Sequence, residues 1–477
     1  LVGLRGTSAR PAWWRGFLTG ASYPALSLYW LYTARLAVGG LAPWTAVLVL
    51  LLSIAILASF VGAAVGCARW ISLRRPRDPV WLLPVVWVAC DWLRNYFPFG
   101  GFPWSVLGQT QAAYLPLIQC ADLTGVYGCT FCIVWVNRWL ARVWEGLRAP
   151  EATEWRWQES ATWATLGLMV FVVAYGVLRY AEVRQTIRSW PTYRVAMVQP
   201  NVPQEEKWTP GLEQRQLQQI HHVMQRLAED AIGLILWPEA SYPWTIDIRQ
   251  ARLPSEHLAP AAGARVTRTP MLIGAVGAAD RHPSGIRYNS AFAVMPEGTI
   301  VGRYDKQHLV PFGEYIPLRR IFFFARRLTA AVGNFVPGLS RGPIHVGRIA
   351  VGPLICYEDI FPDIARAHAR RGAQFFASLS NDAWYGWSAA AAQHFDLSVF
   401  RAVEQRRAVV RATNTGISGI IDPLGRAVIR GRLFEPAILA GEIRLGRGRT
   451  VYGLLGDWFP ALCAAVVLLM LGKVARR

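Results

Sequence analysis

The sequence predicts a membrane α-helical bundle joined to a layered α/β domain. Three observations lead to this fold class. Only 17% of the 477 residues are charged and 53% are hydrophobic, whereas typical soluble domains carry about 25% charged residues. The apolar excess lies in the first 180 residues and the last 25. The stretch between them alternates short strand-like runs with helical stretches and turn signals.

Six stretches are apolar and long enough to span a membrane as helices, which takes about 20 mostly apolar residues. They are 16–35, 43–68, 79–97, 112–137, 160–179 and 454–472. Backbone polar groups in lipid must be satisfied within the segment, so these spans should be helical. For 16–35 alone, a buried core helix is the competing interpretation.

Arginine and lysine residues set the expected orientation. They gather before the first span, between the second and third, between the fourth and fifth, and after the last. Because positively charged loops stay in the cytoplasm, both ends of this chain are expected inside and residues 190–450 outside. The net charge of +20 could also indicate nucleic-acid binding, but the apolar spans and the lack of a nucleic-acid motif favour the membrane.

We therefore expect three regions: a transmembrane helical region of about five spans at 1–189, an α/β domain at 190–450, and a C-terminal transmembrane helix with a basic tail at 451–477. Several strands of the middle region are solidly apolar, which is typical of sheets covered on both faces. The expected strands are Arg194–Val198, Leu234–Trp237, Met271–Val276, Tyr288–Met295, Ile349–Ile355, Gln374–Leu379 and Val409–Thr413. The expected helices are Leu212–Glu229, Asp363–Arg371 and Phe395–Arg406.

Cys356 is the single cysteine of residues 190–450, and the other six lie in or beside predicted spans. A lone thiol in an oxidising compartment is a candidate for reactivity; a small buried core residue is the alternative. The apolar run Ile349–Ile355 ends at Cys356 and polar residues follow. If a helix begins there, its first amides would favour a thiolate and could hold an oxyanion.

A carboxylate and a lysine occupy similar places. Glu239 follows an apolar run in LILWPEAS, and Lys306 follows the strand-like Thr299–Arg303 in GRYDKQHLVPFGEY. Open α/β sheets place their sites just past such strands, although a solvated loop carboxylate and a surface lysine are the alternatives. With Cys356 they can perform acyl transfer: the carboxylate takes the thiol proton and the ammonium stabilises the tetrahedral intermediate.

Nothing in the sequence calls for a metal or another cofactor, and we expect neither. Its histidines show no H-E-x-x-H spacing, and there is no Walker A loop and no G-x-S-x-G elbow. Cys129 and Cys132 form a C-x-x-C pair inside a predicted span. Redox or metal chemistry is conceivable for such a pair, but without a second pair or a histidine at ligand spacing helix packing is favoured.

At these residues the chain closely resembles the nitrilase, or carbon–nitrogen hydrolase, superfamily. The matching segments are WPEAS, YDKQHLVPFGEYIP and ICYEDIFP, which hold Glu239, Lys306 and Cys356. Within the superfamily, KQHLVPFGEYIP, SNDAWYG followed by QHF, RATNTGIS and the flanking apolar helices resemble the apolipoprotein N-acyltransferase branch. The resemblance implies that residues 190–450 form an αββα nitrilase-like sandwich inserted between transmembrane helices.

The resemblance also implies roles for single residues. Glu239 would be the general base, Lys306 the transition-state stabiliser and Cys356 the nucleophile. It further implies a second glutamate near the site, two residues beside the nucleophile and two aromatic residues on mobile arms near a lipid entrance: Glu314, Tyr357, Glu358, Trp208 and Trp384. For both tryptophans, packing or an interfacial belt is the alternative.

The implied reaction has two steps. Cys356 would take a fatty acyl group from a phospholipid, typically phosphatidylethanolamine, and form a thioester. The N-terminal α-amine of an S-diacylglyceryl-cysteine apolipoprotein would then accept the acyl group, with ping-pong kinetics. The implied setting is the bacterial inner (cytoplasmic) membrane, crossed several times by a monomer whose catalytic domain faces the periplasm.

The chain departs from this family in some respects. The family usually has eight spans where six are predicted here, and the sequence begins at Leu1, so the expectation is that its start is missing. Ala392, Val399 and Ala408 replace residues common in the family. Two other functions compete: a membrane-tethered amidase or nitrilase with water as acceptor, and a non-catalytic receptor or scaffold that has kept the fold.

Overall fold

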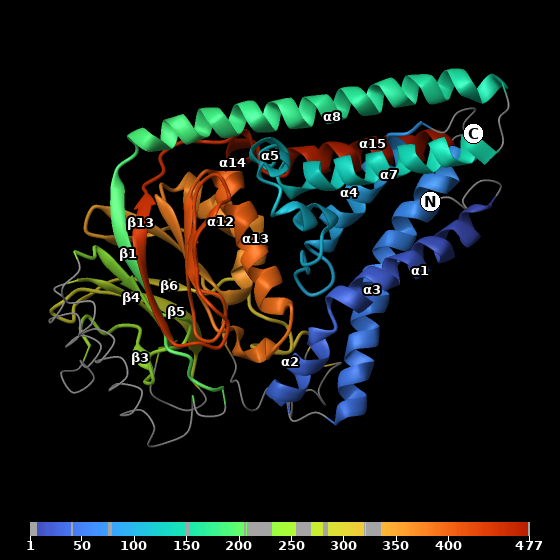
Figure 1. The fold of residues 1–477 in the computed structure, drawn as a ribbon. Helices are drawn as coiled ribbons and strands as arrows, with labels where there is room; N and C mark the ends of the chain where they lie inside the picture. The colour runs from blue at the N-terminus through green and yellow to red at the C-terminus, as the bar shows by residue number, and fades with distance from the viewer. Residues whose placement is uncertain are drawn as a thin grey trace. The chain divides into compact units, whose positions relative to one another are not determined.

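The computed structural model describes residues 7–39, 42–74, 79–148, 152–204, 207, 231–253, 269–279, 285–318, 320 and 335–475. The chain divides into two compact units. A helical unit comprises Leu1–Tyr32, Trp44–Val183 and Thr450–Arg477, and a sheet unit comprises Thr33–Pro43 and Arg184–Arg449. Figure 1 shows the elements of both.

Helices make up the described secondary structure before residue 190 and after residue 450. Their bounds are α1 Ala9–Ser27, α2 Trp30–Gly39, α3 Pro43–Ser72, α4 Leu82–Arg94, η1 Leu107–Gln111, α5 Leu115–Ile118, α6 Ala121–Thr124, α7 Val126–Arg148, α8 Ala152–Thr186, η2 Ile187–Ser189, α14 Val451–Leu455 and α15 Trp458–Ala475.

Two of the described helical segments are long and apolar enough to cross a membrane, Pro43–Ser72 and Glu159–Ser189. They coincide with the predicted spans 43–68 and 160–179. The predicted span 112–137 falls on a pair of helices bent by 118° at Gly125, which would raise the number to three if the pair is one span. Predicted span 454–472 falls on a shorter apolar helix, Trp458–Val474.

The other two predicted spans differ from the structure. Over 16–35 the helix is interrupted, because α1 ends at Ser27 and α2 begins at Trp30. Within 79–97, α4 has 13 residues, and its length of about 20 Å falls short of a hydrocarbon core of about 30 Å. The aromatic, Gly and Pro residues that follow α4 form turns instead of extending it.

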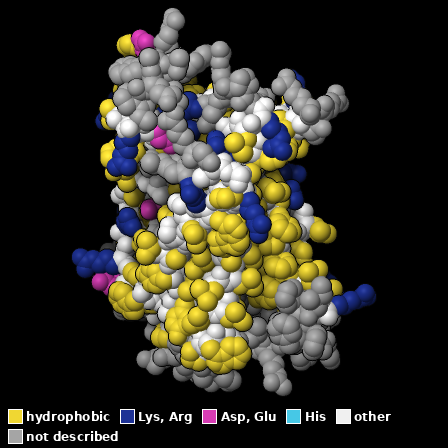
Figure 2. Space-filling view, turned by 90° about the vertical axis from the view of Figure 1, so that its right-hand side faces the viewer, with side chains coloured by type: hydrophobic (Ala, Val, Ile, Leu, Met, Phe, Trp, Pro, Cys, Tyr) yellow, Lys and Arg dark blue, Asp and Glu magenta, His cyan; other side chains and the backbone are white. Residues whose placement is uncertain are grey.

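Large hydrophobic side chains are exposed along the helices of the helical unit. On α3, Leu48, Leu51 and Leu52 are each more than half exposed, and Val170 and Leu178 of α8 are similar. Figure 2 shows hydrophobic side chains spread over a broad part of one face. Soluble monomers rarely expose apolar patches of more than a few hundred Å², so this surface is suited to lipid.

The sheet unit contains two mixed sheets. The first has the order β13-β1-β2-β4-β5-β6, with β3 paired to β4; the second has the order β12-β11-β10-β9-β8-β7. In the first sheet the strands are β1 Thr192–Gln199, β2 Leu234–Leu236, β3 Ile246–Asp247, β4 Met271–Ala278, β5 Arg287–Val294, β6 Ile300–Asp305 and β13 Ala437–Arg444. In the second they are β7 Ile344–Val346, β8 Ile349–Ile355, β9 Phe375–Ser380, β10 Ala408–Thr413, β11 Gly419–Ile421 and β12 Ala427–Arg430.

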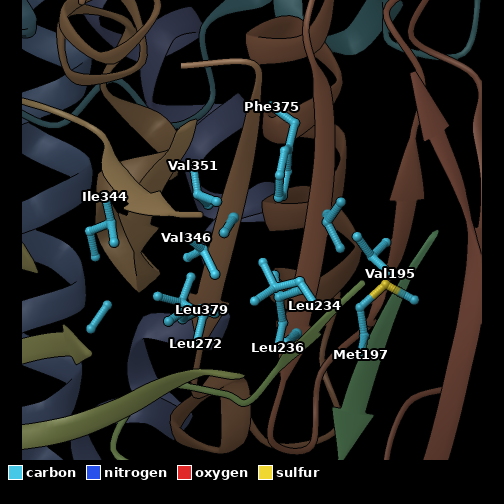
Figure 3. Close-up of a cluster of buried hydrophobic side chains, with 14 of the residues drawn as sticks. Val195, Met197, Leu234, Leu236, Leu272, Ile344, Val346, Val351, Phe375 and Leu379 are labelled. Atoms are coloured by element: carbon cyan, nitrogen blue, oxygen red, sulfur yellow. The ribbon is translucent and has the colours of Figure 1, made fainter. Parts of the chain in front are cut away.

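The two sheets pack face to face through one hydrophobic core. Met197, Leu236 and Leu272 of the first sheet lie in the same cluster as Phe375 and Leu379 of the second (Figure 3). Strands β1, β2 and β4 pair in parallel, and so do β8, β9 and β10. Parallel central strands buried on both faces account for the solid apolar runs of the sequence.

Helices α12 Pro362–Arg370 and α13 Ala390–Gln405 lie along the outer face of the second sheet (Figure 1). The outer face of the first sheet carries a second hydrophobic cluster that includes Trp237 and Ile273. The helix expected at Leu212–Glu229 lies outside the described residues. The described layers are therefore helix, sheet and sheet, with a second apolar face on the first sheet.

Candidate active site

The residues that the sequence singled out lie where strands of the two sheets end. Glu239 comes three residues after β2, Lys306 directly after β6, and Cys356 directly after β8. Strands β2 and β8 belong to the parallel centres of their sheets, whose carboxyl ends are the usual place for sites in α/β folds. The sheet topology thus brings Glu239 and Lys306 together, although they are 67 positions apart in the chain.

Glu239, Lys306 and Glu314 form one buried charged cluster. Lys306 Nζ lies 3.4 Å from Glu239 Oε1 and 3.1 Å from Glu314 Oε1. Asn289 Nδ2 donates to the same two oxygens, at 2.6 and 2.8 Å. Burial by itself lowers the pKa of Lys306, but the two carboxylates outweigh burial and raise it, so the side chain is an ammonium at neutral pH.

Main-chain amides complete the orientation of the two carboxylates. Asn381 N donates to Glu239 Oε2 at 3.0 Å, and Val310 N donates to Glu314 Oε2 at 2.7 Å. Each carboxylate therefore presents one oxygen to a fixed amide and the other to the Lys306 ammonium. A buried ionic cluster of this kind needs such hydrogen bonds to offset its desolvation.

The Cys356 thiol belongs to the same cluster. It is buried, and the charges of Glu239 and Lys306 and a hydrogen bond with Ser380 all act on its pKa. Burial and the negative charge of Glu239 raise the pKa of the thiol, although Lys306 lowers it. The expectation that helix amides favour a thiolate is not met, because only a five-residue 3-10 turn, Cys356–Ile360, follows the strand.

Glu358 connects the turn of the nucleophile to the segment after Lys306. Its Oε2 accepts from Ile355 N at 2.8 Å, while its Oε1 accepts from Gln307 N at 2.7 Å and from the Tyr304 hydroxyl at 2.8 Å. The carboxylate is fully buried, and burial raises its pKa to about 7 in spite of these donors. Glu358 therefore holds the turn that carries Cys356 against the segment that follows Lys306.

The remaining predicted residues are placed as follows. Tyr357 is buried beside the thiol, with its ring against Phe361 at 5.1 Å between centroids. Trp384 is half-buried in the turn Asp382–Tyr385. Trp208 lies outside the described residues.

Sequence reasoning missed several polar residues of the site. Asn289 lies on β5, and nothing in its local sequence distinguishes it from other asparagines. Asn381 follows β9. The Tyr385 phenol is coupled to Cys356 and Glu239, and burial raises its pKa well above its ordinary value. Two of these three residues, Asn381 and Tyr385, lie in SNDAWYG, one of the motifs that carry the family resemblance.

Lys207 is a second buried cation at the site. Its Nζ donates to the main-chain oxygen of Glu239 at 2.9 Å. Burial lowers the pKa of Lys207 to about 8, against the opposing charges of Glu239 and Cys356. Its sequence, QEEKW, looks like an exposed charged stretch, so burial of this lysine could not be foreseen.

Chemically, this arrangement suits acyl transfer through a thiol. A nucleophile with a raised pKa needs a base, and Glu239 is the carboxylate whose charge acts most strongly on the Cys356 thiol. Lys306 supplies a buried positive charge for an oxyanion. Within the described part of the chain, no group of three or more His, Cys, Asp or Glu residues could hold a metal ion.

Comparison with known proteins identifies two family models in the chain. Residues 194–452 match the carbon–nitrogen hydrolase family, which covers more than half of the sequence. Residues 1–139 match the apolipoprotein N-acyltransferase N-terminal domain. The sheet unit therefore has the nitrilase-like fold expected from the resemblance.

Two curated relatives extend over nearly the whole chain. A Geobacter metallireducens protein named apolipoprotein N-acyltransferase is 35% identical over 98% of this chain and 88% of its own length. A Methylococcus capsulatus protein of the same name is 33% identical over 95% of this chain and 86% of its own length.

Solved structures match just over half of this chain at lower sequence identity. A carbon–nitrogen hydrolase from Helicobacter pylori is 16% identical, with a TM-score of 0.41 over 57% of this chain and 98% of its own. Nit3 of Saccharomyces cerevisiae is 19% identical, with a TM-score of 0.41 over 53% of this chain and 90% of its own.

Proposed function

The chain belongs to the apolipoprotein N-acyltransferase family, and from that premise we propose that it moves a fatty acyl group from a phospholipid to an apolipoprotein. The acceptor is the N-terminal α-amine of an S-diacylglyceryl-cysteine, and the donor is phosphatidylethanolamine. The observation that carries the proposal is the buried cluster of Glu239, Lys306 and Cys356 at the strand ends.

In the first half-reaction the Cys356 thiol gives its proton to Glu239 while the sulfur attacks the ester carbonyl of the phospholipid. Lys306 stabilises the oxyanion of the tetrahedral intermediate. When the intermediate collapses, the ester C–O bond breaks and the lysophospholipid oxygen takes the proton from Glu239. The products are a thioester on Cys356 and a lysophospholipid.

In the second half-reaction the neutral α-amine of the apolipoprotein attacks the thioester. Glu239 accepts the proton that the amine loses, and the C–S bond breaks as the amide forms. The proton returns to the sulfur, which restores the Cys356 thiol. Two products leave at separate stages, so the kinetics are ping-pong.

The setting is part of the proposal. The protein works as a monomer in the bacterial inner membrane, which it crosses several times, with residues 190–450 on the periplasmic side. The positive charges that gather in alternate loops of the sequence support this orientation, and the two helices long enough to cross a membrane support the membrane location. Lipid-anchored substrates require a site that reaches the bilayer surface.

The experiment is intact-mass analysis of the purified protein with phosphatidylethanolamine, before and after addition of a diacylated lipopeptide. We expect one acyl adduct on Cys356 that moves to the lipopeptide amine. Cys356→Ala should form no adduct. Cys463→Ala, which changes another buried cysteine in α15, should form it normally.

Three results would count against the proposal. No adduct on the wild-type protein, or an adduct on another residue, contradicts the thioester mechanism. An adduct that disappears equally fast with and without lipopeptide would point to hydrolysis, as in an amidase that uses water as acceptor.

A further inference from the structure

Three family-branch motifs that the proposed chemistry leaves unused each contribute a residue to one buried group around His394, which contacts the main chain of the nucleophile. Asp382 lies in SNDAWYG, His394 in the QHF run and Arg411 in RATNTGIS. All three side chains are almost completely buried. They come from the turn after β9, from α13 and from β10.

His394 connects this group to Cys356. Its Nε2 lies 3.2 Å from the main-chain oxygen of Cys356, and its Nδ1 lies 3.0 Å from Asp382 Oδ1. A carbonyl oxygen only accepts, so Nε2 is the donor of the first hydrogen bond. Burial favours the neutral form of Asp382, but His394 and Arg411 outweigh it and lower the pKa, so Asp382 is a carboxylate.

The helix that carries His394 is itself anchored. Arg411 forms a buried ion pair with Asp359 and lies 3.7 Å from Asp382 Oδ2. Ser398, one turn along α13 from His394, donates to Asp359 Oδ2 at 2.9 Å. The ring is therefore held by its own helix as well as by Asp382.

Cys356 has a backbone conformation that needs such support. Its φ is +51°, in the left-handed region that residues with a Cβ rarely adopt. Strain of this kind persists only where the surroundings fix it. On one side Glu358 accepts from Ile355 N, and on the other His394 donates to the Cys356 carbonyl.

We propose that the Asp382–His394 pair is a positioning device for the nucleophile. Asp382 orients the imidazole, and His394 Nε2 holds the Cys356 carbonyl so that the thiol stays where Glu239 and Lys306 act on it. His394 is a positioning residue and does not touch substrate. The effect on acyl transfer rests on the proposed function, whereas the effect on the thiol itself does not.

Two substitutions separate the two hydrogen bonds of the ring. His394→Gln keeps an amide donor close to the place of Nε2, within reach of the Cys356 carbonyl. His394→Asn keeps an amide donor close to the place of Nδ1, beside Asp382, but its shorter side chain no longer reaches the Cys356 carbonyl. A misplacement of about 1 Å can cost about 100-fold, so we expect a loss of about 10- to 100-fold in thioester formation for His394→Asn and roughly threefold for His394→Gln. The loss should appear in kcat with KM nearly unchanged.

The control is His368→Gln, which changes another fully buried histidine on α12. It should retain activity in proportion to its folded fraction, measured by thermal denaturation. If His394 served only to stabilise the fold, His394→Gln and His394→Asn would lose activity in step with their melting temperatures. Equal losses in the two variants, or a larger loss in His394→Gln, overturn the proposal.

A second readout uses no lipid. The rate at which iodoacetamide alkylates Cys356, followed by intact mass, should fall about tenfold in His394→Asn and change little in His394→Gln. If the wild-type protein forms no acyl adduct but shows this alkylation pattern, the proposed function fails and the positioning role stands. An unchanged alkylation rate in His394→Asn refutes the positioning role whatever the acyl-transfer result.

Discussion

At the scale of single residues, the site is organised around a thiol that is protonated at rest. Burial and Glu239 raise the pKa of Cys356, while Lys306 lowers it. A raised pKa keeps the sulfur unreactive until a substrate arrives, and it makes a base necessary. The two charged neighbours therefore act on the thiol with opposite signs, which can be measured.

Substituting each neighbour should move the reactivity of Cys356 in opposite directions. In Glu239→Gln the negative charge is lost and the thiol pKa falls, so the alkylation rate at a fixed pH should rise. In Lys306→Met the positive charge is lost and the thiol pKa rises, so this rate should fall. Both variants should lose acyl transfer. The measurement is the rate of iodoacetamide alkylation of Cys356 at one fixed pH, and changes of the same sign in the two variants would contradict this account.

Glu358 makes stability depend on pH. Burial raises its pKa from 4.5 to about 7, so between these values the folded protein keeps a proton on Glu358 that the unfolded chain has released. Stability from this residue is therefore highest below pH 4.5 and falls as pH rises to about 7. The difference between the two pKa values corresponds to a change of about 3 kcal/mol in the free energy of unfolding. Glu358→Gln cannot titrate at this position. Its melting temperature minus that of the wild type should therefore increase from pH 5 to 7. A constant difference would contradict the raised pKa of Glu358.

At the scale of elements, the strands next to the site could be predicted because they are apolar on both faces. The runs at Met271–Val276, Ile349–Ile355 and Val409–Thr413 appear as β4, β8 and β10 with small changes at their ends. The helices at Asp363–Arg371 and Phe395–Arg406 appear as α12 and α13. Strands β3, β7, β11, β12 and β13 were missed, because each is very short or only partly buried.

The supporting residues could not be predicted, for a physical reason. Asn289 reaches Glu239 because β5 pairs with β4 in one register, and Lys207 reaches Glu239 from a segment with no regular structure. Neither contact leaves a periodic signal in the sequence. Cysteine, lysine and glutamate stood out because each follows an apolar run, whereas the His394–Asp382 pair depends on how a helix packs against a turn.

Strand β4 also explains how Glu239 is kept in place. A Cβ on Gly274 would lie 2.2 Å from Pro238 O and 2.7 Å from the Glu239 Cα, so only glycine lets this strand approach the segment of the base. We expect Gly274→Ala to displace Glu239 and slow thioester formation by at least about tenfold, since a shift of about 1 Å can cost 100-fold.

Gly277→Ala on the same strand is the matched control. Its Cβ would meet the side chains of Ser290 and Ile248, at 2.9 and 3.1 Å, instead of the main chain at Glu239. Side chains can move aside, so this variant should stay within about threefold of the wild-type rate when compared at a temperature where both are folded. Equal rates for the two variants would show that the close approach at Gly274 does not position the base.

At the scale of the whole molecule, the two compact units differ in where their apolar side chains lie. The helical unit exposes large aliphatic side chains such as Leu51 and Val170, whereas the sheet unit buries its apolar strands between layers. Exposed aliphatic surface on helices is favourable in lipid and costly in water. The charge pattern of the loops predicts which side of the membrane each part occupies.

Surface labelling of intact cells tests this orientation. Leu339 lies in the sheet unit and is 96% exposed, and Arg148 is exposed at the end of α7 in the helical unit. With residues 190–450 outside and the loop after the fourth predicted span inside, a membrane-impermeant maleimide should label Leu339→Cys in intact cells. Arg148→Cys should be labelled only after the inner membrane is permeabilised, because the reagent cannot cross it. The unsubstituted chain, whose cysteines are buried or half-buried, gives the background labelling. Labelling of both variants in intact cells would mean that the positive loops do not set the orientation of this protein.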